Sequence, residues 1–144
     1  IEVGSESRLR NPDSTRPYQH VLEPLCAYLM IAQKQYEEGQ YAGWYNVGPD
    51  ECDCVTTGGL VNLFCRKWGN SLSWENQAEK NAPHEANFLK LDCSKIKSIF
   101  DWKPRWHIED AIGMTVAWTK VWLKHGDIPA EMNRQIRIYV EDKQ

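Results

Sequence analysis

Apolar residues recur at helical spacing in several long parts of the chain and predict a fold made mainly of helices. The strongest stripe covers residues 108–125, carries acidic residues in its first turn and is followed by Gly126. Similar patterns cover residues 24–38 and 57–68, and each is followed by a glycine of the kind that ends helices. A shorter terminal helix is expected over residues 129–140.

The same periodicity predicts which side chains face the core. In the helix over residues 24–38 the expected buried face consists of Leu25, Tyr28, Leu29, Ala32 and Tyr36. The terminal helix is expected to bury one side made of Met132, Ile136 and Tyr139.

Short strands are predicted at residues 44–47, 71–75 and 88–91. A short helix is expected to begin at Asp92 or Ser94, and residues 102–106 should break it. These strands do not alternate regularly with helices, so a complete doubly wound sheet is not expected. We therefore predict an α/β fold of α+β-like character, dominated by helices, in which the chain is a single domain.

Prolines shape the segment of residues 10–24 that leads into the first predicted helix: Pro12, Pro17 and Pro24. Because proline fixes φ and pushes the preceding residue toward an extended conformation, we expect a shaped loop or edge strand. Such a segment holds its side chains in place. Arg10 and Arg16 can then offer planar guanidinium groups to a diphosphate. The alternative is that both arginines are solvated surface residues.

Composition and charge narrow the function classes. The 144 residues carry a net charge of -3 without a basic cluster, which argues against a nucleic-acid partner. Neither a membrane-spanning apolar run nor a signal peptide is visible, so a cytoplasmic protein is expected. The five cysteines, an odd number, are expected to be reduced.

The chain shows no self-sufficient catalytic motif. It contains no Gly-x-Gly-x-x-Gly turn, no phosphate loop and no Gly-x-Ser-x-Gly elbow, so no catalytic or cofactor-binding residue is predicted. Cys52 and Cys54 are spaced more closely than zinc ligand pairs, and no two histidines lie four positions apart. We therefore predict no metal site.

Two further residues are candidate ligands of a nucleotide or sugar. His84 follows Pro83 and precedes a predicted strand, and ligands often bind at strand ends in α/β proteins. An ordinary loop histidine is an equal alternative. Trp74, on the preceding predicted strand, can supply an aromatic wall for a base or sugar, although the pattern alone favours core packing.

Six short motifs occur together along the chain: Arg10-Asn-Pro, Arg16-Pro-Tyr-Gln-His-Val-Leu-Glu-Pro-Leu, Tyr45-Asn-Val-Gly-Pro, Pro83-His-Glu-Ala, Leu89-Lys-Leu-Asp-Cys-Ser-Lys and Trp102-Lys-Pro-Arg-Trp. With them the chain resembles, end to end, the C-terminal part of the CDP-glucose 4,6-dehydratase family. That family lies within the extended short-chain dehydrogenase/reductase superfamily of nucleotide-sugar enzymes.

The resemblance implies an NAD-dependent lyase that converts CDP-glucose to CDP-4-keto-6-deoxyglucose with loss of water, in deoxysugar and lipopolysaccharide biosynthesis. In that family an N-terminal Rossmann domain holds NAD and carries a catalytic Tyr-x-x-x-Lys pair. The resemblance covers only the substrate domain, so the isolated chain is expected to be inactive.

The resemblance also places Arg16 on the substrate diphosphate. Related dTDP-sugar enzymes carry a second diphosphate arginine just before the strand that ends at Asp92, and this sequence has none there. His84, Asn87 or Lys90 can take its place, and Arg10 is a weaker candidate. The predicted substrate-binding set is therefore Arg16, Arg10, His84, Asn87, Lys90 and Trp74.

Two other functions remain open at this point. The chain can be a stand-alone, non-catalytic binding module for a nucleotide sugar, or the substrate domain of a related epimerase or decarboxylase. If the chain is the substrate part of such a dehydratase, apolar surface that would face the missing half of the fold favours self-association, and a homodimer is expected.

Overall fold

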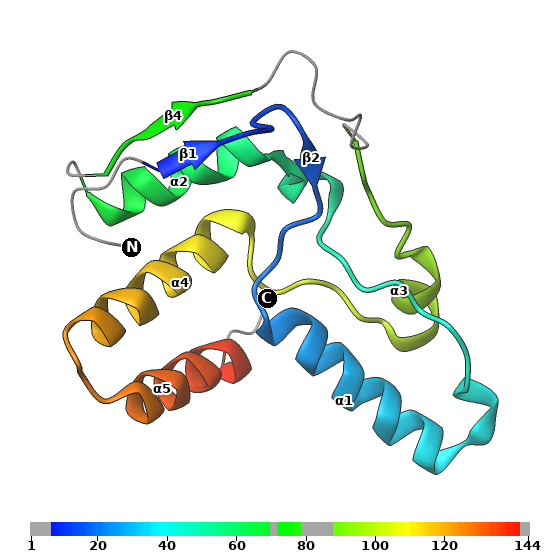
Figure 1. Cartoon of the computed structure of the whole chain (residues 1–144). Helices are drawn as coiled ribbons and strands as arrows, with labels where there is room; N and C mark the ends of the chain where they lie inside the picture. The colour runs from blue at the N-terminus through cyan, green and yellow to red at the C-terminus, as the bar shows by residue number, and fades with distance from the viewer. Residues whose placement is uncertain (1–6, 70–71, 79–87, 142–144) are drawn as a thin grey trace.

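The computed structural model describes residues 7–69, 72–78 and 88–141, and helices dominate them (Figure 1). The α-helices are α1 Leu22–Glu37, α2 Thr57–Trp68, α3 Ser94–Phe100, α4 Ile108–Leu123 and α5 Ile128–Glu141. Single turns of 3-10 helix occur at η1 Gly39–Tyr41 and η2 Glu51–Asp53. The predicted helix-dominated architecture is confirmed. In the described part of the chain, no helix combines the length and the apolar character needed to cross a bilayer.

Short strands form two separate pairs in the described residues. β1 Ser7–Leu9 pairs in parallel with β4 Trp74–Asn76, and β2 Thr15–Arg16 pairs antiparallel with β3 Val55–Thr56. The strand predicted at residues 44–47 is wrong, because the described chain places no strand beside it. The strand predicted at 88–91 is reduced to one bridge, between Phe88 and Thr15.

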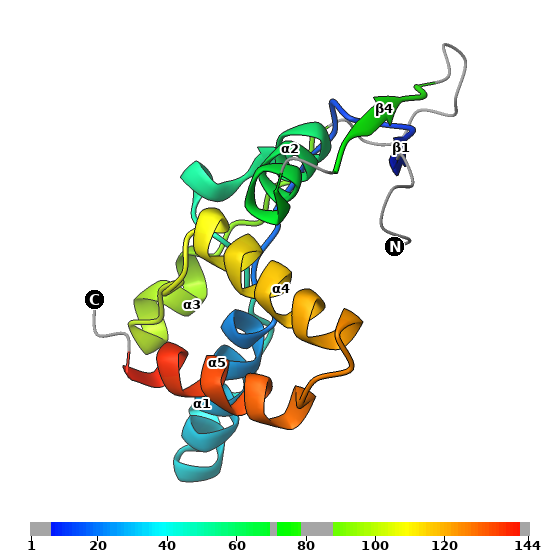
Figure 2. The same ribbon diagram turned by 90° about the vertical axis from the view of Figure 1, so that its left-hand side faces the viewer.

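Figure 1 shows β1 and β4 beside α2 at one end of the molecule, and α1 with α3 at the other. α4 packs against both α2 and α5, and Figure 2 views the molecule from the side on which α4 and α5 lie. A small core between α1 and α3 contains Ala27, Cys93, Ile96 and Trp102. Trp102 belongs to the segment that was predicted to break α3, and burial of its indole holds that segment against the core.

A buried carboxylate joins α1 to two distant parts of the chain. The Glu23 side chain is 0% exposed. It accepts hydrogen bonds from the backbone N–H groups of Arg105 (3.1 Å) and Trp106 (2.9 Å), and from the Tyr139 hydroxyl (2.8 Å). These donors offset the cost of removing the carboxyl group from water. One side chain thus connects α1, the 102–106 segment and α5.

The Glu23 contacts set the rotation of α1 about its axis, and the predicted buried face of this helix is wrong. Glu23 and Ala27 face inward, whereas the apolar side chains of the predicted face are exposed: Leu25 46%, Tyr28 57%, Leu29 74% and Tyr36 94%. The prediction failed because a glutamate is normally assigned to the exposed face of a helix, whereas Glu23 is buried against hydrogen-bond donors from distant parts of the chain. In α5, likewise, Tyr139 is buried while Met132 and Ile136 are exposed.

The proline-rich segment holds the start of α2. Backbone N–H groups of Thr57 and Gly58 donate to the carbonyl oxygens of Ser14 (2.9 Å) and Pro12 (2.8 Å). The Thr56 hydroxyl caps the helix by accepting from Gly59 N–H at 3.0 Å, as its position predicts. The first N–H groups of α2, which lack partners inside the helix, are thereby satisfied by protein.

Replacing Glu23 by glutamine is expected to destabilise the chain by roughly 3 kcal/mol. In glutamine an NH2 group replaces one of the two carboxylate oxygens that accept from Arg105 N–H, Trp106 N–H and the Tyr139 hydroxyl. At least one of these three donors would then lose its acceptor. Urea unfolding measures the loss, and Glu37→Gln on the exposed end of the same helix is the matched control. A midpoint for Glu23→Gln equal to that of the control would contradict the role given to this carboxylate.

Candidate functional site

Arg16, the strongest predicted ligand, lies in β2 at a junction of three chain segments. Its neighbour on one side is Val55 of β3, and on the other side Leu89 N–H donates to Thr15 O at 3.1 Å. The Arg16 side chain is half-buried, and Nη1 donates to Thr15 O at 2.9 Å. Backbone pairing on both sides fixes the position of this arginine, as the proline-rich sequence predicts.

Lys90 lies on the segment that adjoins β2, so the structure brings the neighbourhoods of these two predicted ligands together. Its ammonium forms an ion pair with Glu51 and lies 5.0 Å from the centre of the Phe88 ring. This pairing lowers the pKa of Glu51. Lys97 forms a similar ion pair with Asp50. Sequence reasoning missed these acidic partners, because they lie 39 and 47 positions away from their lysines.

A polar cavity of about 250 Å³ adjoins Lys90. Its charged lining residues are Asp50, Glu51, Lys90, Asp92 and Lys97. Both lysines are already paired to carboxylates, so an anionic ligand would have to displace Glu51 or Asp50. Partly exposed ion pairs contribute little free energy, so displacing the carboxylate would cost little free energy.

The other predicted ligands do not join this group. Arg10 is exposed at the end of β1. Trp74 begins β4, and its indole Nε1 donates to Asn62 Oδ1 of α2 at 2.7 Å. The indole thus packs on α2, and its use as an aromatic wall stays a prediction. His84 and Asn87 lie outside the described residues.

Gly58 and Gly59, a glycine pair at the start of a helix, are the residues of this sequence that most resemble a phosphate-binding turn. A bound phosphate needs free N–H groups and open space at the helix start. Here Gly58 N–H already donates to Pro12 O, and a Cβ at Gly58 would lie 3.2 Å from the Pro12 side chain. The start of α2 therefore does not fit the phosphates of NAD.

Tyr139 and Lys143 have the spacing of the catalytic Tyr-x-x-x-Lys pair. Tyr139 is nevertheless only 4% exposed, and its hydroxyl donates to the Glu23 carboxylate at 2.8 Å. Burial and this carboxylate raise the pKa of Tyr139, which disfavours the ionised form that a catalytic tyrosine base uses. Tyr139 is therefore a structural residue, and the sequence match is coincidental.

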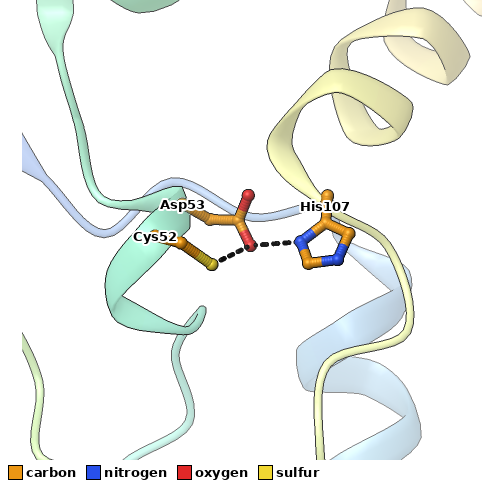
Figure 3. Close-up of side chains that lie close together, drawn as sticks. All are labelled: Cys52, Asp53 and His107. Atoms are coloured by element: carbon orange, nitrogen blue, oxygen red, sulfur yellow. Dashed lines mark hydrogen bonds and ion pairs between the residues drawn. The ribbon is translucent and has the colours of Figure 1, made fainter.

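Cys52, Asp53 and His107 form a separate cluster where η2 meets the start of α4 (Figure 3). Asp53 is 5% exposed, while Cys52 and His107 are exposed. Asp53 Oδ1 accepts from Ile108 N–H at 2.9 Å and caps α4, and Oδ2 lies 2.9 Å from His107 Nδ1. The hydrogen bond and the charge of Asp53 raise the pKa of His107. No local signal predicted this cluster, because His107 lies 54 positions from Asp53.

An apolar cavity of about 330 Å³ lies between α1, α4 and α5. Its residues are His20, Val21, Leu22, Leu25, Thr115, Trp118, Met132, Gln135 and Ile136. The His20 ring contacts Trp106 edge to face at 4.8 Å, and its Nδ1 accepts from Leu22 N–H at 3.3 Å. Burial lowers the pKa of His20, and a hydrogen bond with Gln135 opposes this only in part.

No protein-family model matches the chain. The chain is 41% identical over 141 residues to CDP-glucose 4,6-dehydratase of Salmonella typhimurium strain LT2, and the similarity covers 97% of the chain. The chain spans 39% of the length of this relative. The resemblance to CDP-glucose 4,6-dehydratase that the sequence motifs predicted is therefore confirmed.

Lowering the pH below about 6.5 is expected to destabilise the chain through His20, because the unfolded chain then binds a proton that folded His20 resists. His20→Gln should reduce this pH dependence of the free energy of unfolding. Urea unfolding at about pH 7.5 and pH 5.5 measures it. His125→Gln, which removes an exposed histidine elsewhere in the chain, is the matched control. Identical slopes for His20→Gln and wild type would contradict the expectation.

Proposed function

We propose that this chain is the C-terminal, nucleotide-sugar-binding part of an NAD-dependent dehydratase that converts CDP-glucose to CDP-4-keto-6-deoxyglucose and water. The observation that carries the proposal is 41% identity over 97% of the chain to a CDP-glucose 4,6-dehydratase. In this proposal the Rossmann part that holds NAD is supplied outside these 144 residues.

Arg16 is the residue proposed to bind the substrate diphosphate. Strand pairing with β3 on one side and the Leu89 N–H bond to Thr15 on the other hold the backbone at Arg16, so its planar guanidinium can meet phosphate oxygens in a fixed geometry. Lys90, on the adjoining segment, supplies a second positive charge once a diphosphate displaces Glu51. Binding energy from these groups, remote from the reacting carbons, would position the hexose for reaction.

His84, Asn87, Arg10 and Trp74 stay secondary candidates for the same ligand. Arg10 follows β1, and Trp74 begins β4, which is paired with β1. The diphosphate site is proposed to rest on Arg16 and Lys90.

Arg16→Ala is expected to weaken CDP binding by about 1.5–3 kcal/mol, which is roughly 10- to 150-fold in Kd. Arg16→Lys should recover only part of the loss, because lysine keeps the charge without the planar fork. Calorimetry with CDP and the chain measures both variants. Arg8→Ala, an exposed arginine on β1, is the matched control. Equal affinities for wild type and Arg16→Ala, or no CDP binding by the wild type, would contradict the proposed site.

There are two alternatives to the dehydratase. One is a stand-alone, non-catalytic module that binds a nucleotide sugar, and the other is the substrate domain of a related epimerase or decarboxylase. The mass of the native product in its source cells separates the first alternative from the main proposal. A product more than twice 16.7 kDa supports the dehydratase, whose activity is then assayed with CDP-glucose. A native product near 16.7 kDa supports the module, and loss of water from CDP-glucose separates a dehydratase from the related enzymes.

A homodimer is proposed for the chain on the basis of its exposed apolar side chains. Val21, Leu25, Met132 and Ile136 line the apolar cavity and are between 44% and 60% exposed. Leu29, one turn further along α1, is 74% exposed. Apolar surface of this kind, concentrated on two neighbouring helices, favours association with a second copy.

Leu29→Gln is expected to weaken self-association at least about tenfold without loss of stability, because this leucine is buried only on association. Sedimentation equilibrium over a range of concentrations measures the dimerisation constant. Ile99→Gln, on an exposed position of α3, is the matched control. A monomer at all concentrations, or an equal effect of both exchanges, would contradict a dimer through α1.

A further inference from the structure

Cys52, Asp53 and His107 direct three different metal-binding atoms toward one point (Figure 3). Asp53 Oδ2 lies 2.9 Å from His107 Nδ1 and 3.6 Å from Cys52 Sγ, and all three atoms lie within 4.8 Å of one another. Ligand atoms around a tetrahedral zinc ion are about 3.3–3.7 Å apart, given bond lengths of about 2.0–2.3 Å. The observed separations approach this arrangement, so small side-chain movements suffice.

We propose that Cys52, Asp53 and His107 form a binding site for one Zn²⁺ ion, with water as the fourth ligand. One sulfur, one nitrogen and one oxygen donor suit zinc, which accepts all three in tetrahedral geometry. Three protein ligands beside solvent are the arrangement in which zinc keeps an open position. The inference does not depend on the proposed function.

The charges of the cluster balance in the zinc-bound state. Cys52 enters as a thiolate and releases its proton to solvent. His107 binds through Nδ1 as a neutral imidazole with its proton on Nε2, so the proton between Nδ1 and Asp53 Oδ2 leaves that position when the metal binds. The thiolate and the Asp53 carboxylate together offset the charge of Zn²⁺. The neighbouring carboxylates of Asp50 and Glu51 are paired with lysines, whereas Asp53 faces a thiol, an imidazole and a backbone N–H. Asp53 is thus the acid of this region that faces the two other proposed ligands, and a metal ion would replace its hydrogen bond to His107.

The protein around Asp53 already orients it for this task. Oδ1 accepts from Ile108 N–H at 2.9 Å, and this bond holds the carboxylate so that Oδ2 faces His107. A hydrogen bond that fixes the second oxygen of a ligating carboxylate is typical of metal sites. The exposed Cys52 and His107 leave a path for the ion and its water ligand.

The competing interpretation is that the cluster serves only to cap α4. Capping requires Oδ1 of Asp53 and its bond to Ile108 N–H. It does not require the Cys52 thiol, which lies beside Oδ2 in the same turn, η2. Metal binding that depends on this thiol therefore distinguishes the two interpretations. The prediction of no metal site considered the spacing of Cys52 and Cys54 and the spacing of the histidines, whereas His107 is distant in sequence from Cys52 and Asp53.

Titration of the reduced 144-residue chain with Co²⁺, followed by displacement with Zn²⁺, tests the site. We expect one Co²⁺ per chain, with the near-ultraviolet charge-transfer band of a cobalt–thiolate bond, and its loss when one equivalent of Zn²⁺ is added. Cys52→Ser should abolish the band. Cys52→Ser and His107→Ala should each weaken zinc binding by more than about tenfold, since loss of a ligand exceeds the effect of a group that only orients one.

Cys54→Ser is the matched control, because the Cys54 thiol lies nearby but donates to Asp50 O at 3.7 Å instead of facing Asp53. Circular dichroism of each variant confirms the fold, and Asp53 is left unchanged because it caps α4. Absence of the cobalt band in the wild type, its persistence in Cys52→Ser, its loss in Cys54→Ser, or unchanged zinc affinity in His107→Ala would each overturn the proposal.

Discussion

Burial of the Glu23 carboxylate is the constraint on which most of the arrangement depends. A carboxyl group removed from water must find donors, and here they come from the backbone of Arg105 and Trp106 and from the Tyr139 hydroxyl. Those donors lie more than 80 positions away in the chain, so the fold must close before they meet Glu23. The rotation of α1, the path of the 102–106 segment and the docking of α5 all satisfy this one group.

Local sequence patterns predicted the helices well and their orientation poorly. The positions of α1, α2, α3, α4 and α5 follow from apolar spacing, caps and terminal glycines, which act within one or two turns. The inward face of α1 does not follow from these signals, because apolar periodicity assigns Leu25 and Leu29 to the buried side and the charged Glu23 to the exposed side. Strand predictions suffered similarly, since residues 44–47 have strand composition but the described chain provides no neighbouring strand to pair with them.

The candidate site shows the same division between local shape and distant partners. The shaped conformation around Arg16 was predictable, because prolines act on adjacent residues. That Leu89 would lie beside Thr15, and that Glu51 would pair with Lys90, depends on contacts between segments that no local pattern specifies. Asp53 and His107 are a further case, because their meeting is visible only once η2 and α4 are placed side by side.

The bonds between the proline-rich segment and the start of α2 also determine how Arg16 would meet a ligand. Pro12 and Ser14 are bonded to Gly58 and Thr57, and Thr15 lies between Thr56 of β3 and the segment of residues 88–89. The backbone entropy of this stretch is therefore lost when the chain folds, and little of it remains to be lost when a ligand binds. An arginine on such a preorganised strand gives up mainly side-chain freedom on binding, so more of its interaction energy appears as affinity.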